Sequence, residues 1–219
     1  MPNIMETQTD HIKQLTEIRN MMEKSSRFIS LSGLSGVFAG IVALLGCTAV
    51  YLFLGMTPFS DSHHLYYSNR AYYTNWGIGY RTFFILDALV VFLLAIAGGI
   101  YFTTRKARRK GQQIFDKLTY RLLLALAIPL ATGGLFSIGL WSQGLLGLVA
   151  PITLIFYGLA LINASKYTLQ DIYYLGISEI ILGLLATFNL GYGLEFWGIG
   201  FGLLHIIYGT VMYYKYEKA

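Results

Sequence analysis

The stretch FFILDALVVFLLAIAGGIYFTTRKARRK at 83–110 joins a long apolar run to a cluster of basic residues. A helix needs about 20 mostly apolar residues to cross the hydrocarbon core of a bilayer. Lys and Arg collect at the cytoplasmic ends of such helices. The stretch therefore predicts a membrane-spanning helix that ends on the cytoplasmic side.

The same criterion selects five further apolar segments. The chain is only 12% charged, whereas a soluble domain carries about 25% charged residues. In lipid the backbone polar groups must be paired within each segment, so every span has to be helical. We expect an all-α membrane protein in which 29–219 form a polytopic bundle of six transmembrane helices. The predicted spans lie near 30–54, 82–102, 119–140, 145–164, 172–190 and 196–214, with an external loop at 55–81.

The N-terminal segment at 1–28 is predicted to be a short cytoplasmic helix. Its apolar residues recur at roughly helical spacing, at Ile12, Leu15, Ile18 and Met22. This stripe favours an amphipathic helix that lies along the membrane or against a partner. The alternative is a solvated lead-in helix continuous with the first span, because the stripe is narrow and carries no excess of basic residues.

The basic residues set the expected orientation. Of the 16 Lys and Arg, only Arg70 and Arg81 fall on the external side when six spans are threaded. Positive residues accumulate on the cytoplasmic side of membrane proteins. We therefore expect a multi-pass protein with both termini in the cytoplasm.

One basic cluster follows the second predicted span. It comprises Arg105, Lys106, Arg108, Arg109 and Lys110. A topology anchor explains these charges without a ligand, and contact with anionic lipid head groups is compatible with that role. Nothing in the sequence supports binding of nucleic acid.

The external loop is rich in aromatic residues. They include Tyr66, Tyr67, Tyr72, Tyr73 and Trp76. Such rings can stack on a small ligand such as a sugar, or they can form an aromatic belt at the membrane interface. The adjacent His63 and His64 lack a second pair of ligands, so neither a metal site nor a cofactor is expected.

Ionisable residues inside the spans are the leading candidates for function, because they are costly in lipid. Glu179 and His205 lie in the fifth and sixth predicted spans. At about 1.5 Å per residue, both are roughly 10–14 Å from the cytoplasmic ends. The connection between the spans is short, so we expect a direct or water-bridged contact. The pair is either a proton relay or substrate site, or a structural clasp between helices.

Three other residues are assigned to the same predicted polar path. Asp87 lies about one turn inside the second span and either guards an external entrance or is a boundary charge. Tyr157 and Tyr208 are candidate wall residues.

Gly36 and Gly40 form a GxxxG spacing in the first predicted span. This spacing lets helix backbones approach closely. We expect it to serve packing within one chain. The alternative is a homodimer, and a protein partner could also bind through this span or through the N-terminal helix.

Four stretches carry a resemblance to a known family. They are SSRFISLSGLSGVFAG at 25–40, GIYFTTRKARRKGQ at 99–112, APITLIFYGLALINASKYTL at 150–169 and FGLLHIIYGTVMYYKYE at 201–217. Together they resemble a family of uncharacterised bacterial inner-membrane proteins. The resemblance implies six helices in the bacterial inner membrane. It implies no activity, so no site residue is carried over.

The expected function is transport or binding of a small solute or ion through a polar path at the bundle midplane. A non-catalytic membrane scaffold or a regulatory subunit of a larger complex is the alternative. An enzyme is the third choice, because neither a nucleophile with an oxyanion site nor a metal site is evident.

Overall fold

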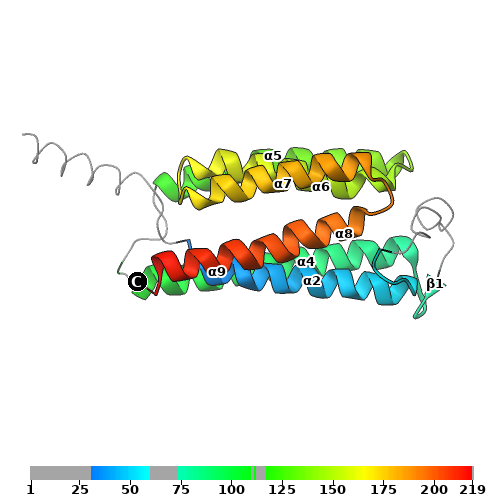
Figure 1. Cartoon of the computed structure of the whole chain (residues 1–219), viewed down its shortest axis with the longest axis horizontal. Helices are drawn as coiled ribbons and strands as arrows, with labels where there is room; N and C mark the ends of the chain where they lie inside the picture. The colour runs from blue at the N-terminus through cyan, green and yellow to red at the C-terminus, as the bar shows by residue number, and fades with distance from the viewer. Residues whose placement is uncertain (1–30, 60–73, 110, 112–116, 219) are drawn as a thin grey trace, which may run out of the picture.

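The structure is a computed structural model that describes residues 31–59, 74–109, 111 and 117–218 (Figure 1). The predicted N-terminal helix at 1–28 lies outside the described residues. The same holds for the loop tyrosines, Tyr66, Tyr67, Tyr72 and Tyr73, and for the pair His63 and His64.

Six helical segments of the described chain are long and apolar enough to cross a membrane. The predicted all-α bundle of six such helices is thereby confirmed. In chain order the segments are α2 (Gly33–Leu54), α4 (Tyr80–Arg109), α5 (Lys117–Ser142), η1 (Leu146–Leu148) with α6 (Val149–Ser165), α7 (Asp171–Phe188), and α8 (Gly193–Trp197) with η2 (Gly198–Leu204) and α9 (His205–Tyr216). A small antiparallel hairpin of β1 (Thr74–Asn75) and β2 (Ile78–Gly79) precedes α4.

The helices form two layers of three (Figure 1). One layer contains α2, α4 and α9, with α2 packed against both of the others. The second layer contains α5, α6 and α7, with α6 in the middle. Contacts between the layers come mainly from the last span, whose segments α8, η2 and α9 pack against α6 and α7. Side chains of the last span are therefore well placed to meet those of the other layer.

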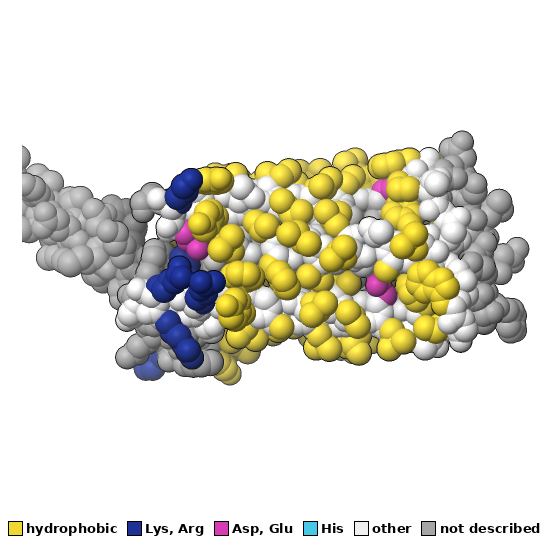
Figure 2. Space-filling model, turned by 90° about the horizontal axis from the view of Figure 1, so that it is seen from below, with side chains coloured by type: hydrophobic (Ala, Val, Ile, Leu, Met, Phe, Trp, Pro, Cys, Tyr) yellow, Lys and Arg dark blue, Asp and Glu magenta, His cyan; other side chains and the backbone are white. Residues whose placement is uncertain are grey.

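The surface suits a lipid environment. Large apolar side chains such as Phe92 of α4 and Leu135 of α5 are exposed. Figure 2 shows hydrophobic side chains over the middle of the molecule and Lys and Arg gathered at one end. A protein in water rarely exposes so broad an apolar surface. Six candidate spans and this surface indicate a multi-pass membrane protein.

The second span is longer than its sequence predicts. The predicted helix ends near 102, whereas α4 continues to Arg109 and carries Lys106, Arg108 and Arg109 in its last turn. Cations at a helix C-terminus interact favourably with the helix dipole. The basic segment therefore extends the helix instead of ending it.

The glycines of the first span pack against the last one. A Cβ placed on Gly40 would lie 2.6 Å from the Gly202 carbonyl oxygen, and one on Gly36 would lie 3.2 Å from the Gly209 Cα. These distances leave no room for side chains, so the two backbones meet directly. The predicted packing of Gly36 and Gly40 within one chain is confirmed, and a second copy would have to use another surface of α2.

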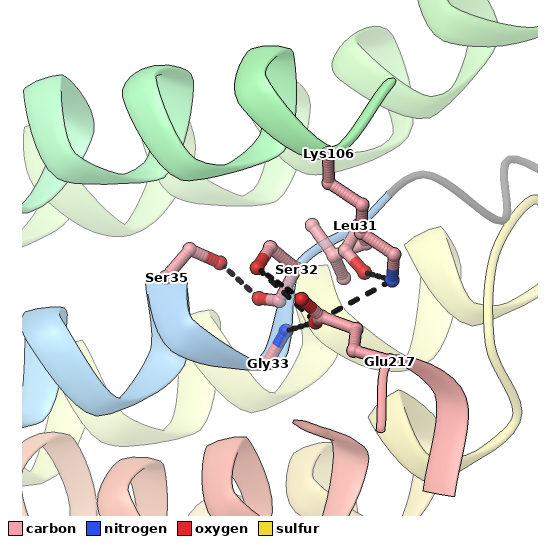
Figure 3. A network of polar contacts seen from close by, with 6 residues as sticks. All are labelled: Leu31, Ser32, Gly33, Ser35, Lys106 and Glu217. Carbon is pink, nitrogen blue, oxygen red and sulfur yellow. Dashed lines mark hydrogen bonds and ion pairs between the residues drawn. The ribbon is translucent and has the colours of Figure 1, made fainter. Parts of the chain in front are cut away.

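Glu217 joins three helix ends at the basic end of the bundle (Figure 3). Its carboxylate accepts the backbone N–H of Gly33 at 2.6 Å and the hydroxyl of Ser32 at 3.1 Å. The Lys106 ammonium lies 3.5 Å from the same carboxylate and donates to the Leu31 carbonyl at 2.6 Å. We call Glu217, Ser32, Gly33 and Lys106 the Glu217 clasp. It supplies a carboxylate to the N-terminus of α2, where anions are stabilised by free N–H groups.

Replacing Glu217 by Gln should lower the free energy of unfolding by about 1–2 kcal/mol, because the α2 N-terminus loses a charged cap and Lys106 loses its counterion. The measurement is thermal or denaturant unfolding of the protein in detergent micelles. Lys218→Gln is the control, because Lys218 is exposed and adjacent. Equal stabilities of Glu217→Gln and the control would contradict a stabilising clasp.

Candidate functional site

Glu179 lies on the buried face of α7. The buried residues of this helix include Leu175, Gly176, Glu179 and Gly183, which recur at helical spacing. Gly176 and Gly183 meet α6 closely, since a Cβ on Gly176 would lie 2.8 Å from the Gly158 carbonyl oxygen. Glu179 lies between these two glycines on the same buried face of α7, and it is 0% exposed.

His205 brings the last span to Glu179. Its Nδ1 lies 3.5 Å from the Glu179 Oε1, so the contact predicted for these two residues is confirmed. Its Nε2 lies 2.7 Å from the Tyr157 hydroxyl of α6. Glu179, His205 and Tyr157, from three different helices, form what we call the buried polar cluster. It lies where the last span meets the α5–α6–α7 layer.

The hydrogen bonds around His205 define its neutral tautomer. Its Nδ1 lies 2.9 Å from the Gly200 carbonyl oxygen. A carbonyl can only accept, so Nδ1 carries a hydrogen in this arrangement. In a neutral imidazole Nε2 is then the acceptor, and the Tyr157 hydroxyl donates to it.

The carboxyl group of Glu179 has no hydrogen-bond donor among the described residues. The 3.5 Å to His205 Nδ1 exceeds an ordinary N–H···O distance of about 2.7–3.2 Å. The other oxygen, Oε2, faces Gly200, where an added Cβ would lie 2.5 Å from it. An ionised carboxylate buried without donors is costly. The described surroundings of Glu179 therefore stabilise its ionised form poorly.

Aromatic rings cover one side of the cluster. The Phe201 ring lies 4.8 Å from that of Tyr157 and 4.8 Å from that of Trp197, measured between centroids. It also stacks on the His205 ring at 5.9 Å. These rings keep the immediate surroundings apolar, which strengthens the electrostatic interactions within the cluster.

Among the described residues, neither Tyr208 nor Asp87 makes a hydrogen bond or an ion pair with this cluster, although Tyr208 and Tyr157 pack against the same apolar group. Tyr208 packs on an apolar group that includes Leu161, Leu175 and Met212. Asp87 is half-buried in the α2–α4–α9 layer, where a Cβ on Gly46 would lie 3.5 Å from its Oδ2. Of the five residues predicted for the polar path, the structure thus brings together Glu179, His205 and Tyr157.

The described residues of the external loop pack against the end of α2. Trp76 lies edge-on to the Phe53 ring at 5.6 Å, although it is 57% exposed. The Asn75 side-chain amide donates to the Phe53 carbonyl at 2.8 Å and so satisfies a carbonyl near the end of α2. Tyr80 is buried in a cluster of apolar side chains that also contains Phe53. The predicted ligand-binding role of the tyrosines falls on residues outside the described part.

The basic cluster after the second span divides in two. Lys106 is buried and belongs to the Glu217 clasp, so its charge is used within the protein. Arg105, Arg108 and Arg109 are exposed, and Lys110 lies outside the described residues. The contact with anionic lipid stays a prediction, and the three exposed arginines are the residues of the cluster that are accessible for it.

No protein-family model, no curated protein and no solved structure matches the chain. The resemblance to a bacterial family therefore stays a prediction. No residue acquires a role from a relative.

Proposed function

We propose that this protein is a small proton-coupled carrier, or a proton-dependent ligand-binding protein, of the bacterial inner membrane with both termini in the cytoplasm. One observation carries the proposal: the Glu179 carboxyl group is fully buried beside His205, and no described residue donates a hydrogen bond to it. Carboxylates and imidazoles in this position build proton pathways in membrane proteins. Glu179 binds and releases the proton, and His205 responds to its charge.

The position of the cluster supports coupling to movement. It joins the last span to the α5–α6–α7 layer, and this span makes most of the contacts between the layers. Alternating access in carriers is largely a rocking of one bundle against another around a site near the membrane midplane. A proton gained or lost at Glu179 changes the interaction that holds the layers together.

A structural clasp in a scaffold or regulatory subunit is the alternative. A clasp needs matched donors and acceptors, because an unsatisfied buried polar group destabilises the fold. The Tyr157–His205 bond meets this requirement, whereas the Glu179 oxygens have no donor in the described chain. This difference favours the proton-binding role.

Spin labels on opposite layers test the proposal. Cysteines replace Ile100 of α4 and Leu123 of α5, which are both exposed apolar positions, in a Cys47→Ala background. We expect the distance distribution between the labels to change with pH in lipid nanodiscs, as proton binding shifts the two layers between states. The change should be lost in Glu179→Gln and retained in Ser178→Ala, a substitution at the adjacent residue. A distribution that does not change with pH, or changes equally in Glu179→Gln, would overturn the proposal.

A further inference from the structure

The last span is π-helical from Gly198 to Leu204, just before His205. Three buried glycines, Gly198, Gly200 and Gly202, occur in this segment. Two of them are required by close neighbours, since a Cβ on Gly200 would lie 2.5 Å from the Glu179 Oε2 and one on Gly202 would lie 2.5 Å from Leu44. Single π-helical turns inside longer helices occur frequently at functional sites.

His205 is bonded to this same segment. Its Nδ1–H donates to the carbonyl of Gly200, five residues earlier, at 2.9 Å. The Glu179 Oε1 lies only slightly farther from the same nitrogen, at 3.5 Å. One hydrogen therefore has two acceptors within reach, one on η2 and the other on α7.

We propose that the Nδ1–H of His205 moves between the Gly200 carbonyl and the Glu179 carboxylate, and that this exchange transmits the charge of Glu179 to the π-helical segment η2. The inference rests on the proposed function and specifies how the proton acts there. When Glu179 is neutral, the Gly200 carbonyl holds the hydrogen, as in the described structure. When the Glu179 proton passes to water, the carboxylate becomes the stronger acceptor, because hydrogen bonds to charged groups are about twice as strong as neutral ones.

The N–H bond of His205 stays intact throughout this exchange. Only the Glu179 proton leaves the cluster, so charge and hydrogen are balanced. The Gly200 carbonyl loses its side-chain donor, so the His205 ring no longer ties η2 to its present geometry. We expect η2 then to rearrange toward regular α-helical bonding, because its π-helical form has lost a contact that stabilises it. The position of the last span then depends on the charge of Glu179.

Tyr157 is the positioning residue in this scheme. Its hydroxyl lies 2.7 Å from His205 Nε2 and donates to it. The Gly200 carbonyl can only accept and so keeps the hydrogen on Nδ1, and the Tyr157 hydroxyl, by donating to Nε2, holds the ring at the angle from which Nδ1 reaches the two acceptors. Contact between the Tyr157 and Phe201 rings holds the hydroxyl in place.

The titratable groups near the cluster come from several elements. Tyr157 of α6 and Glu179 of α7 face His205. Cys47 of α2 and Glu195 of α8 lie near the start of η2. The scheme assigns the pH response to Glu179 alone, so the response must disappear when Glu179 is replaced and survive when Cys47 or Glu195 is replaced.

Nitrogen NMR of the full chain in nanodiscs tests the inference, with ¹⁵N-labelled histidine and His205 assigned from the spectrum of His205→Gln. We expect the Nδ1–H tautomer in the wild type, with a pH-dependent change of its ¹⁵N shift as the acceptor changes. Glu179→Gln should lose the change but keep the tautomer. Tyr157→Phe should keep the Nδ1–H tautomer but shift the Nε2 resonance, because Nε2 loses its hydrogen-bond donor, whereas Tyr174→Phe, at an exposed tyrosine of α7, should leave both resonances unchanged.

Two outcomes would overturn the inference. One is an Nε2–H tautomer in the wild type, and the other is the same pH-dependent shift in Glu179→Gln as in the wild type. The spin-label experiment separates this failure from failure of the proposed function. Layers that move in a Glu179-dependent way while His205 shows the wrong tautomer contradict only the inference. Layers that do not move contradict the proposed function even where the NMR shift is present.

Discussion

Replacing Gly209 by Leu should lower the free energy of unfolding by about 3 kcal/mol or more, at the upper end of the range for overpacking. A Cβ on Gly209 would lie 2.6 Å from the Gly33 carbonyl oxygen and 2.6 Å from the Val37 backbone nitrogen. Both neighbours are backbone atoms of α2 and cannot turn aside as a side chain would. The leucine therefore forces α2 and α9 apart, and the effect is measured as the change in thermal unfolding in detergent micelles.

The matched control for this prediction is Gly99→Leu. Gly99 is also in a membrane-spanning helix, and an added Cβ there would meet nothing within 4 Å. A leucine at this position gains helix propensity relative to glycine, by up to about 1 kcal/mol, and points into open space. Similar destabilisation by the two substitutions would show that the α2–α9 contact is not as close as the structure describes.

The six spans could be predicted because they depend on composition alone. A run of about 20 apolar residues is sufficient to specify a membrane-spanning helix, and all six predicted segments are present in the structure. The ends are harder to predict, because they depend on packing. The helix α4 extends to Arg109, where Lys106 turns inward to meet Glu217 from the other end of the chain. No local pattern relates two residues so far apart in sequence.

Part of the candidate site could also be predicted. Depth along the helix, estimated from the rise per residue, places Glu179 and His205 at one level, and a short connection makes their helices neighbours. Depth already sets Asp87 apart, since it lies near the external end of its span, but depth does not specify which side of a helix faces a partner and so could not exclude Tyr208. Tyr157 was predicted to line the path, but its bond to His205 requires the rotation of α6 about its axis, which only tertiary packing sets.

The sequence does not predict the π-helical form of η2 or the hydrogen bond between His205 and the Gly200 carbonyl. The one available signal is the run of glycines at every second position in GIGFGLL. This spacing does not follow one face of an α-helix, since residues on one face recur every three or four positions. In the structure Gly200 makes room for the Glu179 carboxyl group, and Gly202 makes room for Leu44. The spacing therefore reflects contacts with different helices.

Stability should respond asymmetrically to loss of the two partners in the buried polar cluster. We expect His205→Ala to lower the free energy of unfolding by about 3 kcal/mol, because it opens a cavity and removes the acceptor of the Tyr157 hydroxyl. Glu179→Gln should change stability much less, because it keeps the size of the side chain and removes only an ionisable group that has no donor in the described chain. Functional sites commonly trade stability for activity in this way.

A double-mutant cycle on the unfolding free energies decides whether Glu179 and His205 form a proton site or a structural clasp between helices. In the proton-site scheme, the combined His205→Ala and Glu179→Gln variant is less destabilised than His205→Ala alone, because no buried carboxyl group is left without its nearest N–H. In a clasp each single replacement breaks one shared interaction, so both cost a similar amount. If Glu179→Gln destabilises the protein as much as His205→Ala does, the pair is a structural contact. The scaffold or regulatory role then becomes the better explanation of this membrane bundle.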